Sequence, residues 1–159
     1  DGWVPSHGLT HARILELTYD GRGMVGEDML VCVEAEDEKT FNRVMEEQLT
    51  PGILFQIRFH LHPEADAEID LGGASVSLAL KSGELWLLRS DSGVSMTVEP
   101  SVYLEKGRLK PRAAKQVVLS GRAVAPNTRV RWSLAKANET PDALRDLRMD
   151  ELPFVEAEG

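Results

Sequence analysis

Residues 53–63 alternate between apolar and polar side chains with a period of two. One set of alternate positions is apolar and comprises Ile53, Phe55, Ile57, Phe59 and Leu61. The polar positions between them include Gln56, Arg58, His60 and His62. Successive side chains of a β-strand point to opposite faces, so this pattern predicts a strand with one buried face. The other face of that strand would carry one arginine and two histidines in a row.

Turn signals recur along most of the chain, namely Asp20-Gly21, Gly72-Gly73, Ser82-Gly83, Ser92-Gly93, Lys106-Gly107 and Pro126-Asn127. The alternating or apolar runs between them predict strands at residues 11–19, 22–35, 53–63, 74–80, 84–89, 94–98, 101–105, 116–122 and 129–134. Many short strands separated by turns favour an all-β, antiparallel sandwich of the jelly-roll or supersandwich type. No alternation of strands with helices is evident, which argues against a parallel sheet.

Two segments depart from the strand pattern. Residues 36–48 are charged and predict either a short helix capped by Thr40 or, as we prefer, an exposed insertion between two strands. The tail is acidic, and Thr140-Pro141-Asp142 is typical of a helix start, with fraying expected beyond Glu151. We therefore divide the chain into a sandwich domain, residues 1–136, and a partly helical or disordered acidic tail, residues 137–159.

Composition narrows the choice of partners. A length of 159 residues fits one domain, and 26 acidic against 18 basic residues give a net charge of −8, which argues against binding nucleic acid. No apolar run approaches the roughly 20 residues that span a membrane. The single cysteine, Cys32, excludes an intrachain disulfide and is expected to be a small buried hydrophobe. The chain begins with Asp1 and not with methionine, so we expect a piece of a longer protein whose compartment is unknown.

His60 and His62 lie two residues apart and would point the same way, as a pair of metal ligands can. A third ligand would have to come from His11, Glu27 or Asp28. Arg58 on the same face opposes a cation and suits a carboxylate. We therefore expect a polar groove or an interdomain contact, with the two histidines only weak metal candidates. The motif His11-Ala12-Arg13 places a histidine and an arginine on one face of the first strand in the same way. We expect it to pair with or face the row formed by Arg58, His60 and His62.

Other candidate sites have plainer interpretations. Trp86 and Trp132 lie in predicted strands and are expected to pack in the core, although aromatic side chains on a sheet can also stack on sugars. Glu27 and Asp28 are neighbours on a strand and face opposite ways, so they are not an acid and base pair. One basic cluster surrounds a turn and either contacts an acidic polysaccharide or forms a solvated hairpin tip; it comprises Lys106, Arg108, Lys110, Arg112 and Lys115.

Several ordered motifs together resemble one family. They are Asp1-Gly2-Trp3, residues 8–13 (Gly-Leu-Thr-His-Ala-Arg), Gly26-Glu27-Asp28, residues 57–63 (Ile-Arg-Phe-His-Leu-His-Pro), residues 101–104 and residues 116–121. In this order they are similar to the C-terminal β-sheet domain of heparinase II/III-like proteins. The resemblance covers roughly residues 1–134 and leaves out the acidic insertion and the tail.

The resemblance implies a bacterial polysaccharide lyase that cleaves uronic-acid polymers by β-elimination, in a cleft between a helical toroid and the β-sandwich. It implies that this region supports the toroid and walls the cleft, with an acidic polysaccharide and the N-terminal toroid of the same chain as partners. Zinc or another divalent metal is compatible with the intact protein, as is a periplasmic location. No catalytic residue can be placed here, so we expect the fragment alone to be inactive. The candidates for the cleft or interdomain surface are Arg58, His60, His62, His11 and Arg13.

Two alternatives belong to different functional classes. The first is an autonomous carbohydrate-binding module whose sheet face holds an acidic sugar by itself. The second is a cupin-like sandwich that binds a metal through His60 and His62. Glycan binding that depends on Arg58 and His60 favours the first alternative, and metal content after purification separates the second. The substrate stays open among heparan sulfate, alginate-like uronans and bacterial surface polysaccharides.

Overall fold

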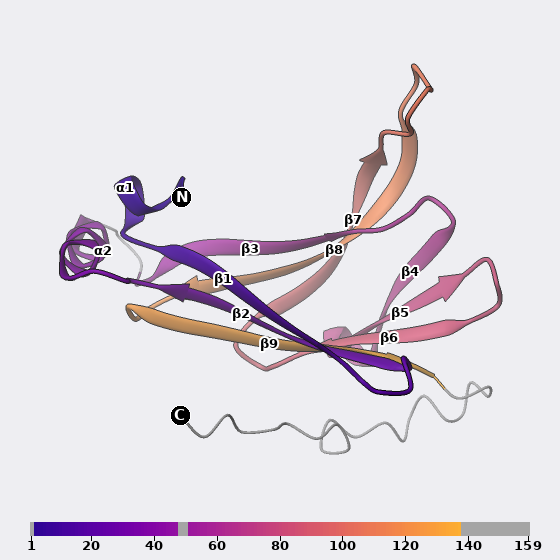
Figure 1. Ribbon diagram of the computed structural model, residues 1–159, viewed down its shortest axis with the longest axis horizontal. Coiled ribbons are helices and arrows are strands. Elements are labelled where there is room, and N and C mark those ends of the chain that lie inside the picture. Colours follow the sequence, from indigo (N-terminus) through magenta and orange to yellow (C-terminus); the bar gives the residue numbers. More distant parts are fainter. Residues whose placement is uncertain (1, 48–50, 138–159) are drawn as a thin grey trace.

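Two antiparallel sheets face each other in the computed structural model, which describes residues 2–47 and 51–137 (Figure 1). In spatial order, the larger sheet comprises β1 (Thr10–Leu17), β2 (Gly23–Val31), β9 (Asn127–Lys136), β6 (Leu85–Ser90), β5 (Ser75–Leu80) and β4 (Ala65–Asp70). The smaller sheet comprises β3 (Ile53–His60), β8 (Arg112–Ala123) and β7 (Ser95–Tyr103). The predicted all-β sandwich is therefore confirmed.

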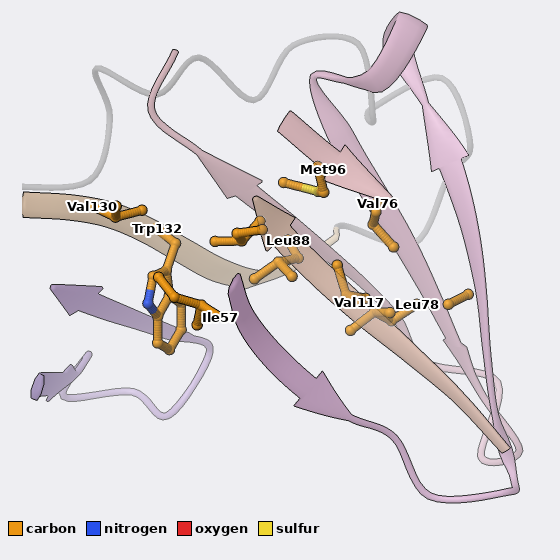
Figure 2. Packing of buried hydrophobic residues seen from close by; sticks show 10 residues of the cluster. Ile57, Val76, Leu78, Leu88, Met96, Val117, Val130 and Trp132 are labelled. Carbon is orange, nitrogen blue, oxygen red and sulfur yellow. The ribbon is translucent and has the colours of Figure 1, made fainter. Parts of the chain in front are cut away.

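The main core lies between the two sheets (Figure 2). Strand β8 supplies its centre, because Val117 and Leu119 are fully buried there. The alternation predicted for β3 is confirmed, since Ile57 is buried while its neighbours Gln56 and Arg58 are exposed. The larger sheet completes the core with Val76, Leu78, Leu88, Val130 and Trp132.

Helices occupy one end of the sandwich, where α1 (Val4–His7) lies beside α2 (Ala35–Glu47) (Figure 1). The short helical insertion expected between two strands is confirmed as α2, but it is not simply exposed, because Phe41 is only 2% exposed and joins a second small core. Thr40 does not cap this helix; its hydroxyl donates to the Glu36 carbonyl one turn earlier. The side chain of Asp37 instead accepts hydrogen bonds from the backbone before the helix.

Four elements differ from the sequence prediction. The separate strands expected at 94–98 and 101–105 are one strand, β7, which accommodates Pro100 because β7 lies at the edge of its sheet. Strand β4 was not predicted, because acidic residues at alternate positions are unfavourable in most strands but suit this edge strand. Helix α1 is too short to give a helical pattern, and a 3₁₀ turn, η1 (Leu71–Gly73), joins β4 to β5.

The predicted acidic tail lies outside the described residues, apart from Ala137, which is buried at the end of β9. Within the described ranges, no helix has the length and apolar character that a membrane crossing requires.

Candidate functional site

A buried carboxylate, that of Asp28, organises the polar centre of the sandwich. Asp28 lies in the middle of β2 and is only 2% exposed. Its Oδ1 accepts hydrogen bonds from His11 Nε2 at 2.6 Å and from Arg13 Nε at 2.8 Å. Its Oδ2 accepts a hydrogen bond from Trp132 Nε1 at 2.8 Å. Both oxygens of the carboxylate are therefore satisfied inside the protein, as burial of a charge requires.

Strand register explains why these side chains meet. Strands β1 and β2 form a hairpin in which Arg13 lies directly opposite Asp28 and His11 lies opposite Leu30, one diagonal step away. On the other side of β2, Trp132 of β9 lies opposite Gly26. A Cβ atom on Gly26 would lie 2.2 Å from the indole ring, so only glycine leaves room for Trp132 to reach across to Asp28.

The pKa of Asp28 reflects two opposed effects. Burial raises the pKa, but the hydrogen bonds from Arg13, His11 and Trp132 outweigh burial and hold the pKa below its ordinary value. The carboxyl group is therefore ionised at neutral pH and can only accept hydrogen bonds. His11 Nε2 must then carry a proton, which leaves Nδ1 of a neutral imidazole as a hydrogen-bond acceptor.

Arg13 connects the two sheets through aromatic contacts. Its guanidinium carbon lies 5.4 Å from the ring centre of Phe59 on β3 and 5.8 Å from that of Trp132. The two rings meet edge to face at 4.8 Å. A guanidinium over aromatic rings gains cation–π attraction in addition to its ion pair with Asp28. This packing fixes the position of β1 against the smaller sheet.

A groove runs between β1 and the free edge of β3 and has two connected chambers of about 200 and 540 Å³. We call it the β1–β3 groove. The smaller chamber is lined by His11, Arg13 and Asp28, and the larger one extends toward His7 of α1. Both chambers share a set of lining residues, namely Trp3, Leu30, Phe55, Gln56 and Arg58. The groove thus combines apolar walls with a few polar groups, as ligand sites commonly do.

Three of the five predicted cleft residues line the β1–β3 groove: His11, Arg13 and Arg58. His11 also meets the ring of Trp3 edge to face, at 6.4 Å between centroids. Arg58 reaches the groove from its rim, where Nη1 donates to Glu99 at 3.0 Å. Because Glu99 lies on β7, this ion pair spans the central strand β8 on the outer face of the smaller sheet.

His60 and His62 lie outside the groove and have separate partners. His60 Nδ1 is 2.8 Å from the Ser101 hydroxyl, and His62 meets Tyr103 edge to face at 5.0 Å. Of the residues that the structure describes, no three histidine, cysteine, aspartate or glutamate side chains are placed to hold one metal ion. The row of polar side chains on β3 is therefore an outer surface, and His11 and Arg13 do not face His60.

The remaining candidates have structural partners. Trp132 is buried and Trp86 packs partly against the core. The basic cluster belongs to the β7–β8 hairpin, whose tip projects from the body of the molecule (Figure 1). Arg108 pairs there with Glu105 at 2.9 Å, and Lys115 pairs with Asp66 at 2.5 Å.

Comparison with known proteins gives the family. A profile described as "Heparinase II/III-like, C-terminal" matches residues 1–133. The chain belongs to this family. The match includes every residue of the Asp28 cluster and of the β1–β3 groove, so the site is part of the shared domain and not of the tail.

This Heparinase II/III-like C-terminal domain is also similar to a curated bacterial protein. It is 36% identical over 139 residues to FtsZ-localized protein C of Caulobacter vibrioides. The alignment covers 86% of this chain but only 22% of that relative. The chain thus spans about a fifth of the length of the relative it matches.

The roles of two residues of this site were missed from the sequence. Asp28 was considered only as a possible third metal ligand and was set aside as an acid or base because its neighbour Glu27 faces the other way. The structure confirms that opposition, since Glu27 binds Arg131 on the outer face. The available signal was a carboxylate at an inward position, between Gly26 and Leu30. Trp3 was missed because nothing in the sequence places the segment before β1 over the groove.

Proposed function

We propose that this domain walls a glycan-binding cleft in a longer, lyase-related protein that acts on uronic-acid polysaccharides by β-elimination. The observation that carries the proposal is the orientation of His11, whose imidazole is held by buried Asp28 at the wall of the β1–β3 groove. Membership of the Heparinase II/III-like C-terminal family makes a polysaccharide the favoured class of ligand.

The groove offers chemistry that suits an acidic sugar. The imidazole of His11 is held in one tautomer, so Nδ1 can accept a proton or a hydrogen bond from a sugar hydroxyl. Trp3 is 53% exposed and presents an indole surface next to His11. At the rim, the Arg58 guanidinium can donate to a uronate carboxylate in place of Glu99.

The domain would complete this cleft only together with other parts of the protein. On β1, the face that carries His11 and Arg13 continues as Leu15 and Leu17, which are 53% and 76% exposed. An apolar strip of this kind, beside charged groups, is typical of a surface that contacts another domain. We therefore propose that β1 forms the contact with the rest of the protein and that the isolated chain binds glycan without cleaving it.

Titration of the chain with uronate oligosaccharides tests this function. We expect saturable NMR shift changes for amides of β1, β3 and α1, and no release of unsaturated uronate. The variant His11→Gln retains a donor for Asp28 but lacks Nδ1, and it should bind at least about tenfold more weakly. His62→Ala, outside the groove, is the matched control and should bind like the parent chain. Equal affinity of the two variants would contradict a glycan site in the groove.

A second candidate function is association with FtsZ, favoured by the 36% identity to FtsZ-localized protein C. The expected result is that the purified chain sediments with FtsZ polymers and stays in the supernatant with unpolymerised FtsZ. If the chain stays in the supernatant in both cases, this region does not carry such an association. His11→Gln should sediment like the parent chain if association and glycan binding use different surfaces.

A further inference from the structure

A second pocket, remote from the groove, lies on the outer face of the larger sheet. It measures about 400 Å³ and is lined by Arg89, Ser90, Asp91, Arg129, Arg131, Trp132 and Ser133. Register places Arg89 of β6 directly opposite Ser133 of β9 on one side and Ser75 of β5 on the other. These three residues alternate with the inward residues Leu88, Leu134 and Val76 and therefore share the outer face. We call this pocket the arginine pocket.

Two of the three arginines in the pocket share one carboxylate. Glu27 on β2 is 18% exposed and accepts from Arg131 Nε at 2.7 Å and from Arg129 Nη1 at 3.4 Å. The other acidic residue, Asp91, is engaged by the backbone. Its two oxygens accept from the N–H groups of Arg131 at 3.0 Å and Gly93 at 3.3 Å.

Arg89 is different, because it has no hydrogen-bonding or ionic partner within residues 2–47 and 51–137. Its side chain is half-buried, and this burial lowers the pKa of the guanidinium. Beside it in register, the hydroxyl of Ser75 is fully buried and also has no hydrogen-bond partner in the described part of the chain. Ser75 does not line the pocket, but Arg89 does, and an anionic ligand there would supply the acceptor that its half-buried charge lacks.

We propose that the arginine pocket binds a carboxylate side chain of an acidic peptide segment from a protein partner, with the planar fork of Arg89 as the principal donor. A guanidinium presents two parallel N–H groups that match the two oxygens of a carboxylate. The hydroxyl of Ser133, opposite Arg89 in the pocket lining, supplies a further donor. This site is separate from the groove, because Trp132 and Asp28 point to the opposite face of the sheet.

Charge and shape favour a peptide over an acidic glycan. Glu27 offsets part of the charge of Arg129 and Arg131, so the pocket has one guanidinium to offer and suits one carboxylate better than a polyanion. Among the described residues, Trp132 is the one aromatic residue of the lining, and its ring turns to the core, so this part of the chain offers no aromatic surface in the pocket to stack on a sugar. One apolar side chain lies farther along the same face, since Ile14 of β1 is opposite Glu27 and is 49% exposed. It suits a peptide whose glutamate or aspartate is flanked by apolar residues.

Titration with a blocked tripeptide, acetyl-Leu-Glu-Leu-amide, followed by NMR of backbone amides and arginine Nε–H groups tests the proposal. We expect saturable shift changes for β6 and β9 and for Arg89 Nε–H, and none with the matching glutamine peptide. Arg89→Gln should weaken binding at least about tenfold. Arg89→Lys keeps the positive charge but loses the two parallel N–H groups of the guanidinium. Its affinity for the peptide should lie between those of the parent chain and Arg89→Gln. The control Arg108→Gln, at the β7–β8 hairpin, should bind like the parent chain.

Three results would overturn the proposal. They are equal shifts with the glutamine peptide, unchanged affinity in Arg89→Gln, and a preference for glucuronate over the glutamate peptide. The Arg89 variants should stay folded, because the parent side chain makes no bond with the described residues that the variants could lose. As a second measurement, Arg89→Met should unfold at the same or a higher urea concentration, since it removes a half-buried charge without a partner. A clear loss of stability in Arg89→Met would show that Arg89 serves the fold instead.

Discussion

Replacing Asp28 by alanine is expected to destabilise the folded chain by about 3 to 5 kcal/mol. The variant removes the acceptor of three hydrogen bonds and leaves Arg13 and the indole N–H of Trp132 without their partner. The guanidinium of Arg13 lies over the rings of Phe59 and Trp132, so turning it fully into water would also give up these two contacts. Urea-induced unfolding followed by circular dichroism measures the loss as a lower midpoint.

The pH dependence of folding stability is an independent test that ionised Asp28 stabilises the folded chain. The folded pKa of Asp28 lies below its unfolded value of about 3.9, so ionised Asp28 favours folding at neutral pH. This contribution is complete above the unfolded pKa and is lost as the pH falls through the folded pKa. The stability difference between the parent chain and Asp28→Asn should therefore shrink as the pH is lowered from about 5 toward 3.

Asp66→Asn is the matched control, because Asp66 also accepts a hydrogen bond from a cation, Lys115, but at an exposed site. Exposed ion pairs contribute little, so this variant should unfold like the parent chain at neutral pH. If Asp28→Ala and Asp66→Asn unfold at the same urea concentration, the carboxylate of Asp28 does not organise the site.

The sequence predicted best those features that depend on local alternation. The faces of β3 follow from the period of two alone, because a half-buried strand needs every second side chain apolar. The opposition of Glu27 and Asp28 follows from the same rule. Phe41, Val44 and Met45 recur at helical spacing in residues 36–48, and these residues pack into the second core. The exposure of this insertion was misjudged because its many charges were given more weight than its apolar residues.

The site depends on pairings that are not local. The hairpin of β1 and β2 places Arg13 opposite Asp28. The turn signal Asp20-Gly21 indicates that these two strands are neighbours, which is one part of that pairing. Trp132 is 104 residues from Asp28 along the chain, and no local pattern specifies that β9 inserts between β2 and β6. The groove is formed by edge strands of two different sheets, so its lining depends on how the sheets pack.

Replacing Trp132 by alanine is the second change with a large expected effect, about 3 to 5 kcal/mol of lost stability. Trp132 is 4% exposed, packs edge to face on Phe59 and covers Gly26. Glycine has no side chain with which to fill the space that the indole leaves, so a cavity should persist beside Asp28. The measurement is the urea midpoint together with the NMR shifts of β2 and β3 amides.

Trp132→Phe keeps an aromatic ring but removes the N–H that Asp28 Oδ2 accepts, together with part of the indole's volume. An unsatisfied buried acceptor costs about 1 to 3 kcal/mol and the lost volume adds to that cost, so this variant should unfold between the parent chain and Trp132→Ala. Trp3→Ala is the control for loss of an indole at an exposed position and should leave the urea midpoint nearly unchanged. If Trp132→Phe were as stable as the parent chain, the indole N–H would contribute nothing to stability, and Asp28 would be held by β1 alone.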